Sequence, residues 1–183
     1  MRVLLAPSWR QPPESLAPWL EPLTQAGFTM AAGPRGRGAA ERALEPYLAL
    51  AGPGDVLGGQ SFGARVASLA AASGRVAPAG LILISFPLSG RGERRCAHWP
   101  QVRCPVLLVS GSNDPLSPLA ELELRSRGLS RAQMAVIEGA GHDLRARAPE
   151  VLDHLIHFLN SLHPGQGQIF PTDQAQIPNI GAA

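Results

Sequence analysis

The stretch DVLGGQSFG, residues 55–63, joins a short apolar run to an alanine-rich segment through the pattern G-x-S-x-G. We interpret residues 55–59 as a buried strand and residues 62–73 as a helix whose small side chains pack closely on a sheet. The glycines are needed because a serine between a strand and a helix lies on a strained turn where neighbouring side chains would clash. The turn raises the Ser61 hydroxyl above the sheet edge, at the positive end of the helix. The pattern therefore predicts that Ser61 is a nucleophile, against the alternative of a structural glycine-rich turn.

On both sides of this stretch, short apolar runs alternate with helical patterns. This order predicts a three-layer α/β sandwich, with a mostly parallel sheet of about six strands flanked by helices and no cap domain. Pro46 marks a point where the second predicted helix can split. The predicted strands are residues 3–6, 28–32, 55–59, 80–86, 105–110 and 133–138, and the predicted helices are residues 15–26, 40–51, 62–73, 119–127 and 149–162.

The length and composition are those of one soluble domain. The 183 residues include 45% hydrophobic and 16% charged residues. We assign residues 1–163 to an α/β domain, and residues 164–183, rich in Gly, Gln and Pro, to a flexible tail. The formal net charge of +2 argues against a nucleic-acid or membrane partner. The chain has no lysine, which excludes a lysine base, a Schiff base and a phosphate-loop lysine.

The two cysteines, Cys96 and Cys104, form neither a disulfide framework nor a metal-binding pattern with the histidines. No apolar stretch has the length of a membrane span, and the first apolar run is too short for a signal peptide. We therefore expect a cytoplasmic protein with reduced thiols and without a metal or organic cofactor. The sequence leaves open whether two copies form a homodimer.

A serine hydroxyl is a weak nucleophile and needs a base that is held in place by a third group. Asp114 follows the predicted strand 105–110, and His142 lies in a glycine-rich loop after the last predicted strand. The carboxyl ends of parallel strands share one edge of the sheet, where open α/β sheets place their ligands. Ser61, Asp114 and His142 are therefore predicted to meet as nucleophile, orienting acid and base. The alternative for Asp114 is a turn-capping residue, since Asn-Asp-Pro is also favourable turn chemistry.

Other histidines and acids are weaker candidates for these roles. His98 lies in a polar connection and is the only serious rival as the base. Asp55 precedes its strand, so it is expected at the opposite edge of the sheet. Asp143 adjoins His142, and adjacent side chains on a loop rarely face each other. The remaining histidines belong to the last predicted helix or to the tail, namely His154, His157 and His163.

Four motifs carry a family resemblance, namely GQSFGAR at 59–65, LISFPL at 83–88, GSNDP at 111–115 and AGHDL at 140–144. With these motifs the chain resembles the compact, lid-poor α/β hydrolases of the dienelactone-hydrolase-like type, including the testis-expressed hydrolase-like proteins. The resemblance spans the chain from Val3 to about Leu162. It implies a serine-hydrolase fold in which Ser61, Asp114 and His142 form the catalytic triad. It implies no particular substrate.

The loop after the first predicted strand departs from the pattern of these proteins. They commonly carry a His-Gly segment there that shapes the oxyanion hole, whereas this chain reads APSWR at residues 6–10. We expect the backbone N–H of Phe62 to be one oxyanion donor and that of Ser8 or Trp9 to be the second. Trp9 and the adjacent Arg10 are expected to contact the substrate. Because losing one donor costs about two to three orders of magnitude in rate, a weak catalyst is an alternative.

The connection from residue 87 to residue 104 occupies the place where lids are usually inserted. It is too short for a cap domain and shows no amphipathic helical pattern, so an open, shallow site is expected. Three arginines early in this connection, Arg91, Arg94 and Arg95, are compatible with an acidic substrate or with a solvated loop. Of the other tryptophans, Trp19 is expected in the core and Trp99 is a candidate for lining a pocket.

Together, these observations predict a serine hydrolase that cleaves a small, soluble ester or thioester through an acyl-enzyme on Ser61. One alternative is a catalytically weak or inactive binding or scaffold protein, which the atypical first loop would favour. The other is an acyltransferase, which would use the same three residues and another acceptor than water.

Overall fold

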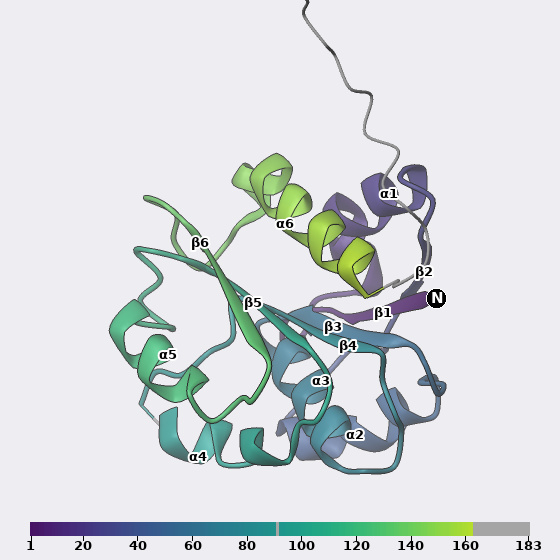
Figure 1. The fold of residues 1–183 in the computed structure, drawn as a ribbon, viewed down its shortest axis with the longest axis horizontal. Coiled ribbons are helices and arrows are strands. Elements are labelled where there is room, and N and C mark those ends of the chain that lie inside the picture. The colour runs from purple at the N-terminus through teal and green to yellow at the C-terminus, as the bar shows by residue number, and fades with distance from the viewer. Residues whose placement is uncertain (91, 163–183) are drawn as a thin grey trace, which may run out of the picture.

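The computed structural model describes residues 1–90 and 92–162, so the tail predicted for residues 164–183 lies outside the described residues. Within the described ranges, six strands form one sheet in the order β2-β1-β3-β4-β5-β6, and every neighbouring pair is parallel. This confirms the predicted α/β class (Figure 1). The strands are β1 (Arg2–Ala6), β2 (Thr29–Ala32), β3 (Val56–Gln60), β4 (Gly80–Ile84), β5 (Val106–Gly111) and β6 (Ala132–Ile137).

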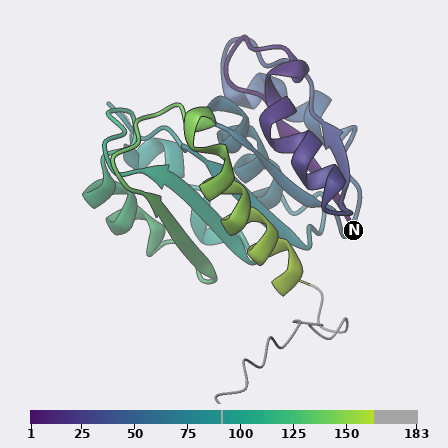
Figure 2. The same ribbon diagram turned by 90° about the horizontal axis from the view of Figure 1, so that it is seen from above.

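Helices cover both faces of the sheet. Helices α1 and α6 pack on one face, and helices α2 to α5 pack on the other (Figures 1 and 2). The central strands β3, β4 and β5 are buried along their whole length, which explains their continuous apolar sequences. The helices are α1 (Ala17–Gln25), α2 (Ala40–Leu48), α3 (Phe62–Ala72), α4 (Gly92–Cys96), α5 (Leu119–Ser126) and α6 (Ala148–Ser161).

Helix α3 lies close to the sheet because its buried face carries glycine, alanine and serine. Its first turn approaches the end of β1, where a β-carbon at Gly63 would lie 2.1 Å from the carbonyl oxygen of Ala6. Only glycine fits that contact without a shift of the backbone. The small-residue face thereby brings the start of α3 against the carboxyl edge of the sheet.

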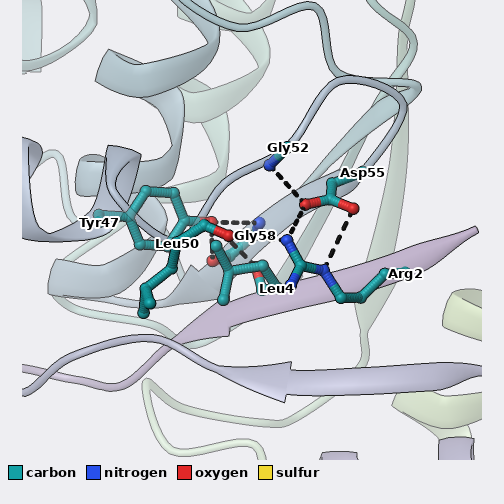
Figure 3. A network of polar contacts seen from close by, with 7 residues as sticks. All are labelled: Arg2, Leu4, Tyr47, Leu50, Gly52, Asp55 and Gly58. Carbon is teal, nitrogen blue, oxygen red and sulfur yellow. Dashed lines mark hydrogen bonds and ion pairs between the residues drawn. The ribbon is translucent and has the colours of Figure 1, made fainter.

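A polar network joins helix α2 to strands β1 and β3 (Figure 3). The buried Tyr47 hydroxyl lies within hydrogen-bond distance of two acceptors for its single proton, the carbonyl oxygens of Leu4 (2.9 Å) and Gly58 (3.2 Å), and it accepts the Gly58 N–H at 3.0 Å. Burial raises the pKa of Tyr47, so the hydroxyl keeps its proton. Close by, Arg2 Nη2 lies 2.5 Å from Asp55 Oδ2. The structure thus gives Asp55 a structural partner at the amino ends of β1 and β3.

The structure corrects three expectations about individual elements. Pro46 does not split α2, since it lies inside a continuous helix, which ends two residues later at Leu48 instead of continuing to residue 51. The predicted helix over residues 15–26 begins with a separate 3₁₀ turn, Pro13–Leu16, before α1. The connection from residue 87 to 104 is not without helix, since it contains α4 and the 3₁₀ turn Trp99–Gln101.

Among residues 1–90 and 92–162, no helix combines the length and the apolar character that crossing a bilayer requires.

Candidate active site

Ser61 lies on a strained turn between β3 and α3. Its backbone has φ 51° and ψ −109°, in a region that residues other than glycine rarely adopt. The turn is held by the Ser61 N–H, which donates to the Ile84 carbonyl oxygen at 2.8 Å. It also depends on Gly59, where a β-carbon would lie 2.4 Å from the backbone of Gly63. The side chain of Ser61 is thus displayed at the carboxyl edge, directly before the amino end of α3.

The loop that carries His142 packs against the end of β5. A β-carbon at Gly111 would lie 2.2 Å from the Ala140 carbonyl oxygen, so a glycine is required for this approach. The N–H of Asn113 donates to the same Ala140 oxygen at 2.9 Å. These contacts join the loop after β5 to the loop after β6. They bring Asp114 and His142 together although 28 positions separate them in sequence.

The structure brings Ser61, His142 and Asp114 into one hydrogen-bonded chain. His142 Nδ1 lies 2.8 Å from Asp114 Oδ2, and His142 Nε2 lies 2.8 Å from Ser61 Oγ. A carboxylate only accepts hydrogen bonds, so the imidazole proton belongs on Nδ1. Nε2 of the neutral ring then accepts the Ser61 hydroxyl proton. This arrangement can withdraw that proton when the hydroxyl attacks a carbonyl carbon.

Asp114 is buried, with no exposure of its side chain, whereas the side chain of His142 is 25% exposed. The second carboxylate oxygen of Asp114, Oδ1, accepts the N–H of Leu116 at 2.8 Å. Both carboxylate oxygens therefore have donors, as a buried charge requires. The Asn-Asp-Pro turn does serve as turn chemistry, but the same carboxylate also binds the histidine.

The site lies where the sheet topology changes direction. The chain leaves β1 toward the face covered by α1 and leaves β3 toward the face covered by α3, so a crevice opens between their carboxyl ends. The register pairs Ala6 with Gly59, which places the loop of Ser8 beside Ser61. Ser8 Oγ donates to the Gln60 carbonyl oxygen at 3.4 Å. The crevice is thus the natural position for a ligand.

Three backbone N–H groups border this crevice. Phe62 is the first residue of α3, where N–H groups have no partner inside the helix. In the part of the chain that the structure describes, the N–H groups of Ser8 and Trp9 donate to no acceptor, whereas that of Arg10 donates to the Gly36 oxygen at 3.1 Å. The loop that replaces the His-Gly segment therefore retains free donors at its first two positions after Pro7.

The rival base and acid have other partners. His98 Nε2 lies 2.8 Å from Ser68 Oγ, which itself donates to the Arg65 carbonyl oxygen at 2.8 Å. Ser68 must therefore accept from His98, and Ser68 is fully buried. Asp143 binds the guanidinium of Arg145 through Nε, at 2.8 Å and 3.0 Å, and through Nη2, and this contact lowers the pKa of the carboxyl group.

A cavity of about 560 Å³ opens beside Ser61, and we call it the Ser61 cavity. Trp9, which was predicted to contact substrate, lines it and is 50% exposed. The guanidinium of Arg10 stacks over the Trp9 ring at 4.4 Å. Sequence reasoning missed other lining residues, including Leu116 and the segment 38–41. The signal available for residues 38–41 was that they follow β2, whose carboxyl end lies at the same edge of the sheet as Ser61.

Charged side chains also line the Ser61 cavity. Arg65 and Glu41 form an ion pair at 2.5 Å, and both face the cavity. Of the three arginines singled out in the connection after β4, Arg95 lines the cavity and donates to the Pro87 carbonyl oxygen at 3.0 Å, while Arg94 is exposed. The position of Arg91 lies outside the described residues.

A smaller cavity of about 170 Å³ lies beside His142, and we call it the His142 cavity. It is lined by polar side chains, among them Ser8, Gln60 and Arg145. Gln60 lies within the G-x-S-x-G motif, but the sequence pattern assigned no role to it. The other two tryptophans contribute to neither cavity, because Trp19 and Trp99 are completely buried.

The cysteines and metal-binding groups add no second site within the described residues. Burial raises the pKa of Cys104 to about 11 and also raises that of Cys96, which disfavours a thiolate nucleophile. In the ranges 1–90 and 92–162, no three His, Cys, Asp or Glu side chains gather in a geometry that could hold a metal ion.

A parallel sheet covered on both faces, with a serine on a strained strand-to-helix turn, defines the α/β-hydrolase fold. A family model described as "Alpha/beta hydrolase domain" matches residues 39–159. The chain therefore belongs to this family of α/β hydrolases. A search of curated proteins found no match.

Solved structures with the same fold include several enzymes. A monoacylglycerol lipase of Paleococcus ferrophilus has a TM-score of 0.76 at 15% identity, over 88% of this chain and 95% of that one. A thermophilic esterase of Thermogutta terrifontis has a TM-score of 0.72 at 20% identity, over 89% and 90%. A thioesterase domain from the curacin biosynthetic pathway has a TM-score of 0.72 at 14% identity, over 85% and 90%. At these identities the likeness concerns the fold.

Proposed function

We propose that this protein is a serine hydrolase that cleaves small esters or thioesters through an acyl-enzyme. The observation that carries the proposal is the chain from Ser61 Oγ to His142 Nε2 and from His142 Nδ1 to Asp114 Oδ2, each step 2.8 Å long. Solved enzymes of the same fold support it, since they include a lipase, an esterase and a thioesterase.

In the proposed mechanism, the Ser61 oxygen attacks the carbonyl carbon while His142 Nε2 takes the hydroxyl proton. Asp114 keeps the imidazole in the required tautomer and stabilises its positive charge. The N–H groups of Phe62 and of Ser8 or Trp9 bind the oxyanion. His142 then gives the proton to the leaving group, and water releases the acyl group by the same steps in reverse order.

Within the α/β hydrolases, we assign the chain to the compact dienelactone-hydrolase-like proteins. The assignment rests on the four motifs around Ser61, Asp114, His142 and residues 83–88. The small size of the connection between β4 and β5 supports it. Helix α4 has five residues and is no cap domain. We also propose that residues 1–163 form the catalytic domain.

The proposal is tested by a fluorophosphonate, which modifies only an activated serine. We expect one equivalent of label on the wild type and none on Ser61→Ala. The matched control is Ser68→Ala, because Ser68 also contacts a histidine at 2.8 Å but is buried and should not react. This variant should label like the wild type. Absence of label on the folded wild type would favour the binding or scaffold alternative, and label on another serine would contradict the assigned nucleophile.

A further inference from the structure

The two cavities at the candidate site differ in chemistry. The Ser61 cavity has apolar surface from Trp9, Phe62 and Leu116, beside the Arg65–Glu41 pair. The His142 cavity has no apolar side chain in its lining, which consists of Ser8, Gln11, Ser15, Gln60, His142, Asp143 and Arg145. A group with hydrogen-bonding capacity would therefore find polar side chains as partners in the His142 cavity.

The charges in the His142 cavity cancel. Asp143 and Arg145 bind each other through several hydrogen bonds, so their opposite charges offset each other. Ser15 Oγ donates to the Pro12 carbonyl oxygen at 2.7 Å, and Ser8 Oγ donates to that of Gln60. The chemistry that remains for a ligand is neutral and polar.

Gln60 lines this cavity, and one contact fixes the orientation of its side-chain amide. Trp19 Nε1 lies 3.3 Å from Gln60 Oε1, and an indole nitrogen can only donate. This contact therefore decides the amide orientation and leaves Nε2 on the other side. Gln60 is only 8% exposed, yet it lines the cavity. Among the described residues, Gln60 Nε2 has no hydrogen-bond partner in the protein. It is also not one of the side-chain atoms that are completely buried without a partner.

The proposed reaction determines which half of the substrate contacts the His142 cavity. His142 must return its proton to the leaving group, so the leaving oxygen lies on the histidine side of Ser61. The acyl group then lies toward the Ser61 cavity, which Ser61 and Phe62 line. This step rests on the proposed function.

We infer that the His142 cavity binds the leaving group and that Gln60 Nε2 donates a hydrogen bond to it. The substrate is accordingly an ester of a short acyl group with an uncharged alcohol that carries further hydroxyl groups. Gln60 is the residue that determines this preference, and Trp19 positions its amide.

The test compares glycerol 1-butyrate with propyl butyrate, which differ only in the two further hydroxyl groups of the alcohol. Each kcat/KM is divided by the rate of hydroxide-catalysed hydrolysis of the same ester, which removes the difference in leaving-group reactivity. One net hydrogen bond corresponds to about a three- to tenfold preference for the glycerol ester in the wild type. Equal corrected values, with both esters cleaved, would overturn the inference and leave the proposed hydrolase intact.

Two variants test the residue itself. Gln60→Leu removes the donor and also the acceptor of Trp19, whereas Gln60→Glu keeps an acceptor for the indole and has no N–H. Both should reduce the preference to about one, and thermal unfolding of Gln60→Glu reports whether the core is retained. The control is Gln101→Leu, because Gln101 is exposed in the 3₁₀ turn after α4, and it should keep the preference. A preference retained in both Gln60 variants would contradict the assignment of Gln60.

Binding keeps the inference testable without turnover. If the wild type cleaves neither ester, nuclear magnetic resonance titration of Ser61→Ala with both esters decides the inference, and fluorophosphonate labelling separately tests the proposed function. Tighter binding of the glycerol ester that Gln60→Glu removes would support a site for hydroxylated groups. Equal binding of the two esters would overturn it.

Discussion

His142 Nδ1 lies 2.8 Å from Oδ2 of Asp114, whose side chain is completely buried and whose other oxygen accepts the Leu116 N–H. A buried carboxylate with this geometry accepts a hydrogen bond from the imidazole N–H and cannot face water instead. The pair therefore fixes which ring nitrogen of His142 is directed at Ser61.

Asp114→Asn should lower kcat for ester hydrolysis by about four orders of magnitude. The amide would present N–H to the ring, so that His142 would carry its proton on Nε2 and could not accept one from Ser61. Thermal unfolding should change far less, because the amide keeps the volume and the acceptor for Leu116. A variant with near wild-type kcat would show that Asp114 only caps its turn.

His142→Ala should reduce kcat/KM on p-nitrophenyl acetate by up to about six orders of magnitude. The imidazole lies partly exposed at the edge of the sheet, so the melting temperature should be almost unchanged. His98→Gln is the matched control, since that ring contacts the buried Ser68 and lines neither cavity. Loss of activity in His98→Gln, with activity in His142→Ala, would reverse the assignment of the base.

His98 should make stability depend on acid pH. The pKa of His98 is lowered to about 4, compared with 6.5 for an ordinary histidine. Burial is the main cause and the charge of Arg65 acts in the same direction, while Glu41 opposes the shift. The unfolded chain takes the proton first as the pH falls. The contribution of His98 to the free energy of unfolding is therefore complete above pH 6.5 and is lost between pH 6.5 and 4.

The full loss is about 2 to 3 kcal/mol. In His98→Gln, an amide can still donate to Ser68 but does not titrate. Urea unfolding at pH 7 and at pH 4 should show a smaller decrease in this variant than in the wild type, by about that amount. Equal decreases in both proteins would show that His98 is not the responsible group.

Gly63→Ala should lower the free energy of unfolding by about 3 kcal/mol or more, or prevent soluble expression. Its methyl group would lie 2.1 Å from the Ala6 oxygen, and backbone atoms cannot give way as a flexible side chain can. Gly141→Ala is the control, because nothing lies within 4 Å of a β-carbon there and the φ angle is not positive. Comparable losses in both variants would contradict the close approach of α3 to β1.

The acyl group should be short. Trp9 and Leu116 are exposed for about half of their surface, 50% and 40%, so a long chain would leave the Ser61 cavity into water. Each methylene contributes about 0.8 kcal/mol only if it is removed from water. We predict that kcat/KM on p-nitrophenyl esters is highest from acetate to butyrate and then falls or flattens. A steady increase to the decanoate would indicate a long apolar groove instead.

The sequence alone was sufficient for the architecture and for the candidate residues of the reaction. Continuous apolar runs such as residues 80–84 record burial on both faces, and glycines beside Ser61 record a turn that no other residue fits. Because strands in a parallel sheet end at one edge, residues that follow β3, β5 and β6 had to approach one another. These are local properties, and each is written in a few consecutive residues.

Only the tertiary structure decided what surrounds that edge. Helix α4 has five residues, too few for a periodic pattern, and the sequence therefore did not reveal it. The orientation of the Gln60 amide depends on Trp19, 41 positions away, and the partner of His98 is Ser68, 30 positions away. Periodicity shows which face of an element is buried but not which distant side chain meets it. That choice depends on how helices on opposite faces pack against the sheet, and it determines both cavities.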